Sequence, residues 1–197
     1  MNNFSHLDKS GNVRMVDVTD KIDTSRIARA EGKIFMKSET ISAISDNAIP
    51  KGNVLTTAKI AGIQAAKKTF EMIPMCHQLN LSFVDIEFTI HSDWIQINSL
   101  VKTKDATGVE MEALSAVSVA ALTIYDMCKS LDKTMSIGEV KLIKKTGGKS
   151  DHVMAYKPNV GIITLSDSIA KGDSKDQSGT ILFDGFLNAG CSVEHQK

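Results

Sequence analysis

The stretch TGVEMEALSAVSVAALTIYDMCK (107–129) contains side chains whose types could do chemistry. Glu110 and Glu112 stand at its start, Asp126 and Lys129 stand at its end, and the run between them is uncharged. A carboxylate and an ammonium three positions apart share one face of a helix, where they can pair with each other or exchange protons with a ligand. A plain ion pair at a solvated helix end is the simpler interpretation, and spacing alone leaves both open.

The two ends of this predicted helix are too far apart to serve one small-molecule site within one chain. At 100° and 1.5 Å per residue, Glu112 lies within about 40° of Asp126 around the axis but roughly 21 Å away along it. The small residues between them permit close approach of neighbouring elements, including a second copy of the chain. Two copies lying antiparallel across a two-fold axis would bring the acidic end of one to the other's YDMCK end, forming a shared site.

Two loop residues are further candidates. Lys51 lies in IPKGNVL, where it could neutralise a phosphate approaching the flexible glycine, although an exposed loop lysine is the simpler interpretation. His77 follows Cys76 in EMIPMCHQL and could contact a ligand phosphate, although most loop histidines are solvated or capping groups. A zinc site would need more cysteines or histidines nearby, and none is placed for one.

Composition excludes several classes of protein. The chain has 197 residues, of which 42% are hydrophobic and 23% charged, enough for one globular domain and a fragment of a second. With a net charge of zero it has no basic field that would gather nucleic acid or an anionic membrane. Three scattered cysteines, a polar N-terminus and an uncharged run of thirteen residues predict a cytoplasmic protein without disulfides, signal peptide or membrane span.

The pattern along the chain predicts interleaved helices and antiparallel strands. Strands are expected at 15–18, 32–36, 81–90, 94–103 and 139–145, and helices at 38–49, 55–73 and 110–131. Residues 24–31 could be strand or turn. This order favours an α+β fold of ferredoxin-like type, with helices on one face of an antiparallel sheet. The apolar residues of WIQINSLV predict that another subunit partly covers the other face.

Two local features of the helices are also predicted. Ser38 has the side chain of an N-cap, because its hydroxyl can accept a hydrogen bond from a free backbone amide. In the 55–73 helix, a buried stripe is expected at Ile60, Ile63, Ala66 and Phe70.

The character of the chain changes after residue 145. The stretch 146–158 reads as a linker, and TGGKS within it is not a phosphate loop, since position 143 is Ile where that motif requires glycine. A buried parallel-type strand (159–167), a helix (180–190) and the start of another strand follow. They predict an incomplete βα appendage, the opening of a doubly wound domain.

Five blocks carry a resemblance to a known family: MVDVTDK, PKGNVLTTAKIAGIQAAKKT, IPMCHQL, TGVEMEALSAVSVAALTIYDMCK and KKTGGKS. Together they closely resemble cyclic pyranopterin monophosphate synthases of molybdenum cofactor biosynthesis. The resemblance covers about residues 4–150, within a domain expected over 1–150, and implies a ferredoxin-like fold. It also implies a homo-oligomer, a hexamer built as a trimer of dimers, with active sites at subunit interfaces.

The resemblance also implies the reaction and the residues that serve it. A 3′,8-cyclised 7,8-dihydroguanosine 5′-triphosphate becomes cyclic pyranopterin monophosphate, with release of pyrophosphate. The implied catalytic residues are Asp126, Lys129 and Lys51. The implied substrate-binding residues are Met75, Cys76, His77, Glu110, Met111, Glu112 and Lys67.

This chemistry suits those residue types. Lysines and a histidine can gather a triphosphate of about four negative charges without a globally basic protein. A carboxylate and a lysine with shifted pKa values suit the proton transfers, although the opposing effects of a charged neighbour and of burial on the aspartate are not separable from sequence. No metal site and no tightly bound cofactor are expected, beyond a Mg²⁺ ion carried on the substrate phosphates.

The tail, 159–197, resembles the start of molybdopterin adenylyltransferases, through SD and DQSG. It follows a linker at 151–158, and the later glycine-rich loop and catalytic aspartate of that family are missing, so no adenylyl transfer is expected. An unrelated βα appendage is the alternative for the tail. For the whole chain, the alternative is a non-catalytic nucleotide-binding or scaffold module of the same pathway.

Overall fold

The computed structural model describes residues 10–148, 159–165, 172, 175–188 and 191–196. The chain divides into two compact units, Met1–Gly148 and Lys149–Lys197. All the candidate site residues lie in the first unit. The linker predicted over 151–158 falls outside the described residues.

The first unit is built on a sheet of four antiparallel strands in the order β2-β3-β1-β4. The strands are β1 (Thr24–Phe35), β2 (Leu81–Ile90), β3 (Trp94–Asp105) and β4 (Ser136–Thr146). The predicted hairpin of β2 and β3 is confirmed. β1 pairs with β3 along its whole length, so residues 24–31, which the sequence left open, are strand.

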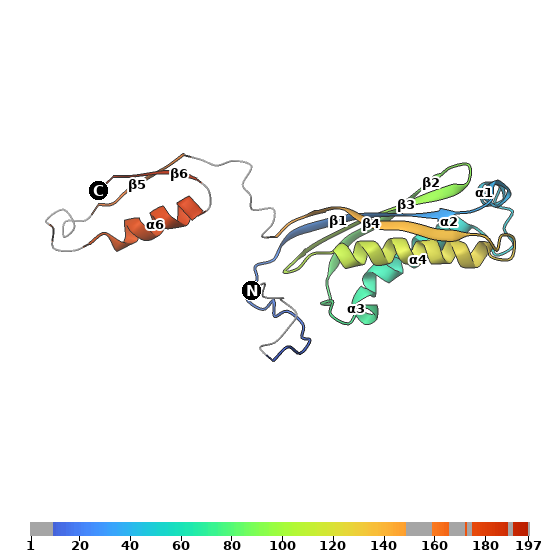
Figure 1. Ribbon diagram of the computed structural model, residues 1–197, viewed down its shortest axis with the longest axis horizontal. Coiled ribbons are helices and arrows are strands. Elements are labelled where there is room, and N and C mark those ends of the chain that lie inside the picture. Colours follow the sequence, from blue (N-terminus) through green and yellow to red (C-terminus); the bar gives the residue numbers. More distant parts are fainter. Residues whose placement is uncertain (1–9, 149–158, 166–171, 173–174, 189–190, 197) are drawn as a thin grey trace. The chain divides into compact units, whose positions relative to one another are not determined.

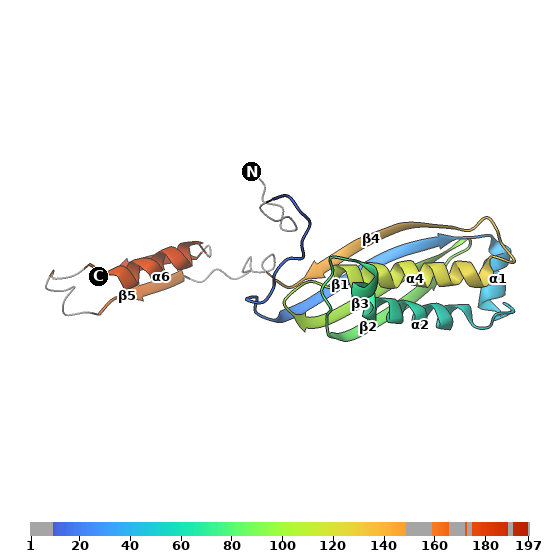
Figure 2. The same cartoon turned by 90° about the horizontal axis from the view of Figure 1, so that it is seen from below.

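Two long helices cover one face of this sheet. The helices of the unit are α1 (Ser38–Ser45), α2 (Val54–Lys67), α3 (Thr69–Met72) and α4 (Glu110–Cys128). Figures 1 and 2 show α2 and α4 side by side on the same side of the sheet. A βαββαβ element order with this strand arrangement is ferredoxin-like. The predicted α+β fold class is confirmed.

The core forms around α4. Ala113, Ala116, Ala120 and Ala121 are buried completely, and Ser99 of β3 donates a 2.8 Å hydrogen bond to the Ala113 carbonyl oxygen. By length and composition, the 19-residue α4 could cross a bilayer. The prediction from sequence considered only the thirteen uncharged residues within it, which are too few to do so. Most apolar residues of α4 are instead buried against the sheet and α2, as in the core helix of a globular domain, although Met111 and Leu122 are exposed.

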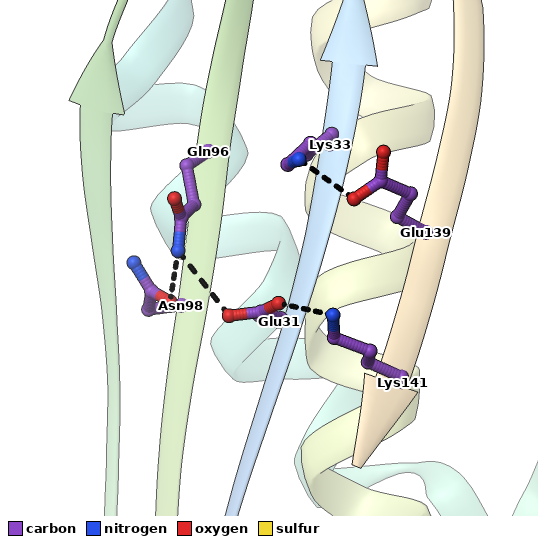
Figure 3. A network of polar contacts seen from close by, with 6 residues as sticks. All are labelled: Glu31, Lys33, Gln96, Asn98, Glu139 and Lys141. Carbon is purple, nitrogen blue, oxygen red and sulfur yellow. Dashed lines mark hydrogen bonds and ion pairs between the residues drawn. The ribbon is translucent and has the colours of Figure 1, made fainter. Parts of the chain in front are cut away.

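The opposite face of the sheet carries a lattice of polar side chains (Figure 3). Lys33 pairs with Glu139 at 2.6 Å, and Lys141 pairs with Glu31 at 2.9 Å. The Glu31 carboxylate also accepts a 3.3 Å hydrogen bond from the Gln96 amide. Cross-strand pairs of this kind help to fix the register of the strands. Cover of this face by another subunit stays a prediction.

Two local predictions are wrong. Residues 15–18 form no strand, and the Val16 carbonyl oxygen instead accepts a hydrogen bond from the His77 side chain. Ser38 is not the N-cap of α1: Lys37 is, and its backbone N–H donates a 2.8 Å hydrogen bond to the Asp132 carboxylate from the loop after α4. A contact 95 residues away in sequence replaces the local cap.

The stripe predicted for the second helix is wrong in part. Ala66 is buried, but Ile60 is 61% exposed, and the helix is broken at Lys68 into α2 and α3. Small residues of α2 are buried instead, including Ala58 and Gly62, and Gly62 lies against Ala116 and Ala120 of α4. Bulky side chains would hold the two helices apart, so close packing places them off the contact line.

The second unit contains β5 (Asn159–Ile163), α6 (Gln177–Asn188) and β6 (Ser192–Gln196). β5 and β6 pair in parallel, which agrees with a doubly wound opening. The prediction that the first strand is fully buried is wrong: Ile162 is buried, but Ile163 is 71% exposed. Two strands and one helix cannot cover both faces of a parallel strand.

Substitution at Gly62 tests the contact between α2 and α4. An added Cβ would lie 2.7 Å from the Ala116 carbonyl oxygen and would clash with the Ile86 side chain. We expect Gly62→Ala to lower the free energy of unfolding by about 1–3 kcal/mol, although alanine is the better helix former. Urea denaturation measures the change, with Gln64→Ala on the exposed side of α2 as the control, expected to stay within about 0.5 kcal/mol. A Gly62→Ala variant as stable as wild type would contradict the packing.

Candidate functional site

The C-terminal end of α4 holds a carboxylate between two lysines. Lys51, in the loop before α2, donates hydrogen bonds to the Asp126 carboxylate at 2.9 Å and to its backbone carbonyl at 2.8 Å. Lys129, one turn on, pairs with the other carboxylate oxygen at 2.6 Å. The predicted i,i+3 pair is therefore present, and the structure adds Lys51 from 75 residues away. All three side chains are about half exposed.

At this cluster, the neighbouring positive charges lower the pKa of Asp126 more than burial raises it. The hydrogen bond from Lys129, followed by that from Lys51, lowers the pKa of Asp126 to about 2. The same contact raises the pKa of Lys129. Because the aspartate is open to solvent, the desolvation that would raise its pKa is small. At neutral pH the cluster is one carboxylate between two ammonium groups, with a net positive charge.

A pocket of about 570 Å³ lies at the other end of α4. Three segments line it: residues 16–21, residues 73–79 and residues 107–112. The lining includes six of the predicted binding residues: Met75, Cys76, His77, Glu110, Met111 and Glu112. The structure therefore brings together residues that are more than 30 positions apart in the sequence. Lys51, Asp126 and Lys129 are not among the lining residues.

Glu112 is the most perturbed group in the pocket. Its side chain is 4% exposed, and its Oε2 atom has no hydrogen-bond partner among the residues that the structure describes. Burial, with a smaller effect of the Glu110 charge, raises its pKa to about 7. Burial also raises the pKa of the Cys76 thiol, to which the Glu112 charge contributes. A buried carboxyl that is neutral for part of the time near pH 7 can either donate or accept a hydrogen bond.

Glu110 differs from Glu112 in its contacts. Its carboxylate pairs with Lys145 of β4 at 2.9 Å. Lys67, the remaining predicted binding residue, is exposed and does not line the pocket. Since Lys51 before α2 meets the C-terminal end of α4, the two helices are antiparallel. Lys67, in the last turn of α2, therefore lies toward the pocket end.

Sequence reasoning missed several residues at this end of the molecule. Val16, Val18 and Lys21 line the pocket, and Lys145 neutralises one of its carboxylates. Their spacing does not predict this position, because they reach the pocket through contacts between distant segments. The signal that could have found them is their place in MVDVTDK and KKTGGKS, two of the blocks that carry the family resemblance. The TGGKS motif, by contrast, stands out in the sequence, and its glycine has a structural explanation. Gly147 has φ +102°, and a Cβ there would lie 2.8 Å from the Arg26 side chain. The left-handed backbone and the close packing on Arg26 account for that glycine.

Metal ligation has no support in the described part of the chain. No group of three or more His, Cys, Asp or Glu side chains there could hold an ion. Both oxygens of Asp126 are occupied by ammonium groups, and such a donor set repels a cation.

Comparison with known proteins decides the family. The model of the MoaC family matches residues 15–148, which span the whole fold around α4. The chain belongs to the MoaC family. Cyclic pyranopterin monophosphate synthases of Desulfatibacillum aliphaticivorans and Peptoclostridium acidaminophilum are 58% and 57% identical to it. Those alignments cover 76% and 75% of this chain, and 96% and 94% of the two synthases.

A bifunctional molybdenum cofactor biosynthesis protein of Chlorobaculum tepidum is similar over nearly the whole chain. It is 58% identical over 191 residues, which cover 97% of this chain. The chain spans only 61% of the length of that relative. The similarity therefore continues past the MoaC match and through the second unit.

The pKa of Glu112 can be tested through stability. Its folded pKa of about 7 lies above its ordinary value of 4.5, so the carboxyl stabilises the fold below about pH 4.5 and that contribution is lost as the pH rises to about 7. We expect the free energy of unfolding of wild type, relative to Glu112→Gln, to fall by up to about 3 kcal/mol across this window. Urea denaturation at a series of pH values measures it. Parallel pH profiles for the two proteins would contradict the raised pKa.

Proposed function

We propose that the first unit is a cyclic pyranopterin monophosphate synthase. It converts a 3′,8-cyclised dihydroguanosine triphosphate to cyclic pyranopterin monophosphate and releases pyrophosphate. The observation that carries the proposal is the Asp126 carboxylate held between Lys51 and Lys129, in a chain that is 58% identical to a synthase over the length of the domain.

The lysine-rich cluster suits the phosphate chemistry. In ring closure, a substrate hydroxyl attacks the α-phosphorus, the bond from that phosphorus to the β-phosphate oxygen breaks, and pyrophosphate leaves. The ionised Asp126 can accept the proton that the hydroxyl loses. Lys51 and Lys129, both charged, can neutralise the leaving pyrophosphate, which should be the larger contribution.

The pocket suits the other part of the substrate. The carboxyls of Glu110 and Glu112 line it, and carboxylates repel phosphates but accept hydrogen bonds from N–H groups. A guanine-derived or pterin ring presents an edge of such donors. Met75 and Met111 add apolar lining that a flat ring can contact. We infer that the ring system binds here and that the triphosphate binds at the lysines.

A shared site follows from these two assignments. The two binding regions lie at opposite ends of α4, roughly 21 Å apart along the axis, which is too far for one substrate molecule. We infer that the pocket of one subunit meets the Lys51–Asp126–Lys129 cluster of another. A hexamer built as a trimer of dimers, with active sites at its interfaces, is the assembly proposed.

The proposal also covers the metal requirement, the partners and the cellular location of the protein. Mg²⁺, if present, would travel on the substrate phosphates, and no step depends on it. The substrate is a nucleotide derivative, and neither nucleic acid nor membrane is a proposed partner. Because the family serves molybdenum cofactor biosynthesis, we place the protein in the cytoplasm.

For the second unit we propose the start of a domain like the molybdopterin adenylyltransferases. Two observations support this: the parallel β5-α6-β6 arrangement, and the similarity to the Chlorobaculum tepidum bifunctional protein across the unit. Asp176 organises the start of α6 by accepting hydrogen bonds from the Gly179 amide and the Thr164 hydroxyl, both at 2.7 Å. Adenylyl transfer is not proposed for this chain.

Turnover of the cyclised GTP tests the proposed activity. Wild type should release pyrophosphate and form a product that oxidises to a fluorescent pterin. Asp126→Asn and Lys51→Ala should each reduce kcat by about 100-fold or more, because each removes a charge at the reacting phosphate. Lys59→Ala is the matched control: this α2 lysine also pairs with an aspartate, Asp85, at 2.6 Å, but it lies outside both regions. No product from wild type, or full activity in Asp126→Asn, would reject the proposal.

A further inference from the structure

Residues 15–21, here called the strap, form one wall of the pocket at the N-terminal end of α4. Val16, Val18 and Lys21 supply this wall. Val16 and Val18 are partly buried, whereas Met15, Asp17 and Thr19 are exposed. An extended chain turns alternate side chains to opposite sides, so the two valines face the pocket and the residues between them face solvent.

The strap has little regular structure to hold it in place. In the part of the chain that the structure describes, residues 14–18 show no helix or strand hydrogen bonding. A turn follows, in which the Asp17 carboxylate accepts hydrogen bonds from the Thr19 amide at 3.0 Å and from the Thr19 hydroxyl at 2.7 Å. These contacts shape the strap, but they do not attach it to the body of the unit.

His77 supplies an attachment. Its Nε2 atom lies 2.8 Å from the Val16 carbonyl oxygen, across 61 residues of sequence. A carbonyl oxygen can only accept, so Nε2 carries the proton and donates. The neutral Nε2–H tautomer and the imidazolium both meet this requirement. Nδ1 is then the ring nitrogen left for a ligand.

We propose that His77 is a positioning residue, whose Nε2–H holds the strap against the pocket so that Val16 and Val18 complete its wall. The hydrogen bond comes from the MCHQL segment, which itself lines the same pocket. His77 thus joins two walls that no strand pairing connects. That this wall contacts the substrate rests on the proposed synthase function, whereas the attachment itself does not.

Two amide substitutions separate the ring nitrogens of His77. The Gln side chain can place its NH₂ group where Nε2 lies, and the shorter Asn side chain can place it only near Nδ1. Trypsin can cut within or beside the strap, after Arg14 and after Lys21, and mass spectrometry can follow both cuts. We expect His77→Asn to be cut about fivefold faster than wild type, the effect of losing one typical hydrogen bond. His77→Gln should be cut at nearly the wild-type rate.

Activity and folding are measured on the same proteins. His77→Asn should raise KM for the cyclised GTP more than it lowers kcat, and His77→Gln should restore KM. His91→Ala is the control, since His91 stacks on Trp94 in the β2–β3 turn and does not line the pocket. Thermal melting checks that every variant is folded.

Two results would overturn the inference. One is cleavage of folded His77→Asn at the wild-type rate. The other is faster cleavage of His77→Gln than of His77→Asn, because Nδ1 would then make the attachment. If wild type releases no pyrophosphate, the synthase proposal fails, and the cleavage comparison still decides the role of His77.

Discussion

The rest of the structure depends on the close packing of α4 against α2 and the sheet. Alanines along this helix let α2 approach to the distance at which Gly62 touches the helix backbone, and the sheet closes the other side. A helix held this way cannot bend or shift without opening the core. The separation between its two ends is therefore a fixed length, and the chemistry must be arranged around it.

The two ends of α4 place carboxyl groups in opposite environments. Asp126 is open to water between two lysines, and its pKa falls to about 2. Glu112 is buried, one of its oxygens has no partner in the described part of the chain, and its pKa rises to about 7. One group is therefore a permanent anion, and the other can exchange a proton near neutral pH. This difference agrees with one end handling phosphates and the other an N–H-rich ring.

The hydrophobic and charge patterns of the sequence correctly predicted those features that depend on interactions between residues close in sequence. The β2–β3 hairpin and the spacing of Asp126 and Lys129 both follow from periods of two and 3.6 residues, and both are confirmed. The ferredoxin-like class followed from the order of elements. The wrong predictions depend on distant contacts: Asp132 replaces the expected Ser38 cap, and the packing of α2 on α4 displaces the expected stripe. The strap and Lys145 reach the pocket only through tertiary structure, so no spacing could reveal them. The roles of the site residues came from family resemblance and stay proposals.

If the pocket of one subunit and the lysine cluster of another form one site, two inactive variants should restore each other. Mixing Glu112→Gln subunits with Asp126→Asn subunits, after dissociation and reassembly, would create some interfaces with an intact Glu112 from one chain and an intact Asp126 from the other. Random assembly predicts about a quarter of the wild-type pyrophosphate release, from two proteins that are each inactive alone. A mixed oligomer as inactive as its parents would contradict a site shared between subunits.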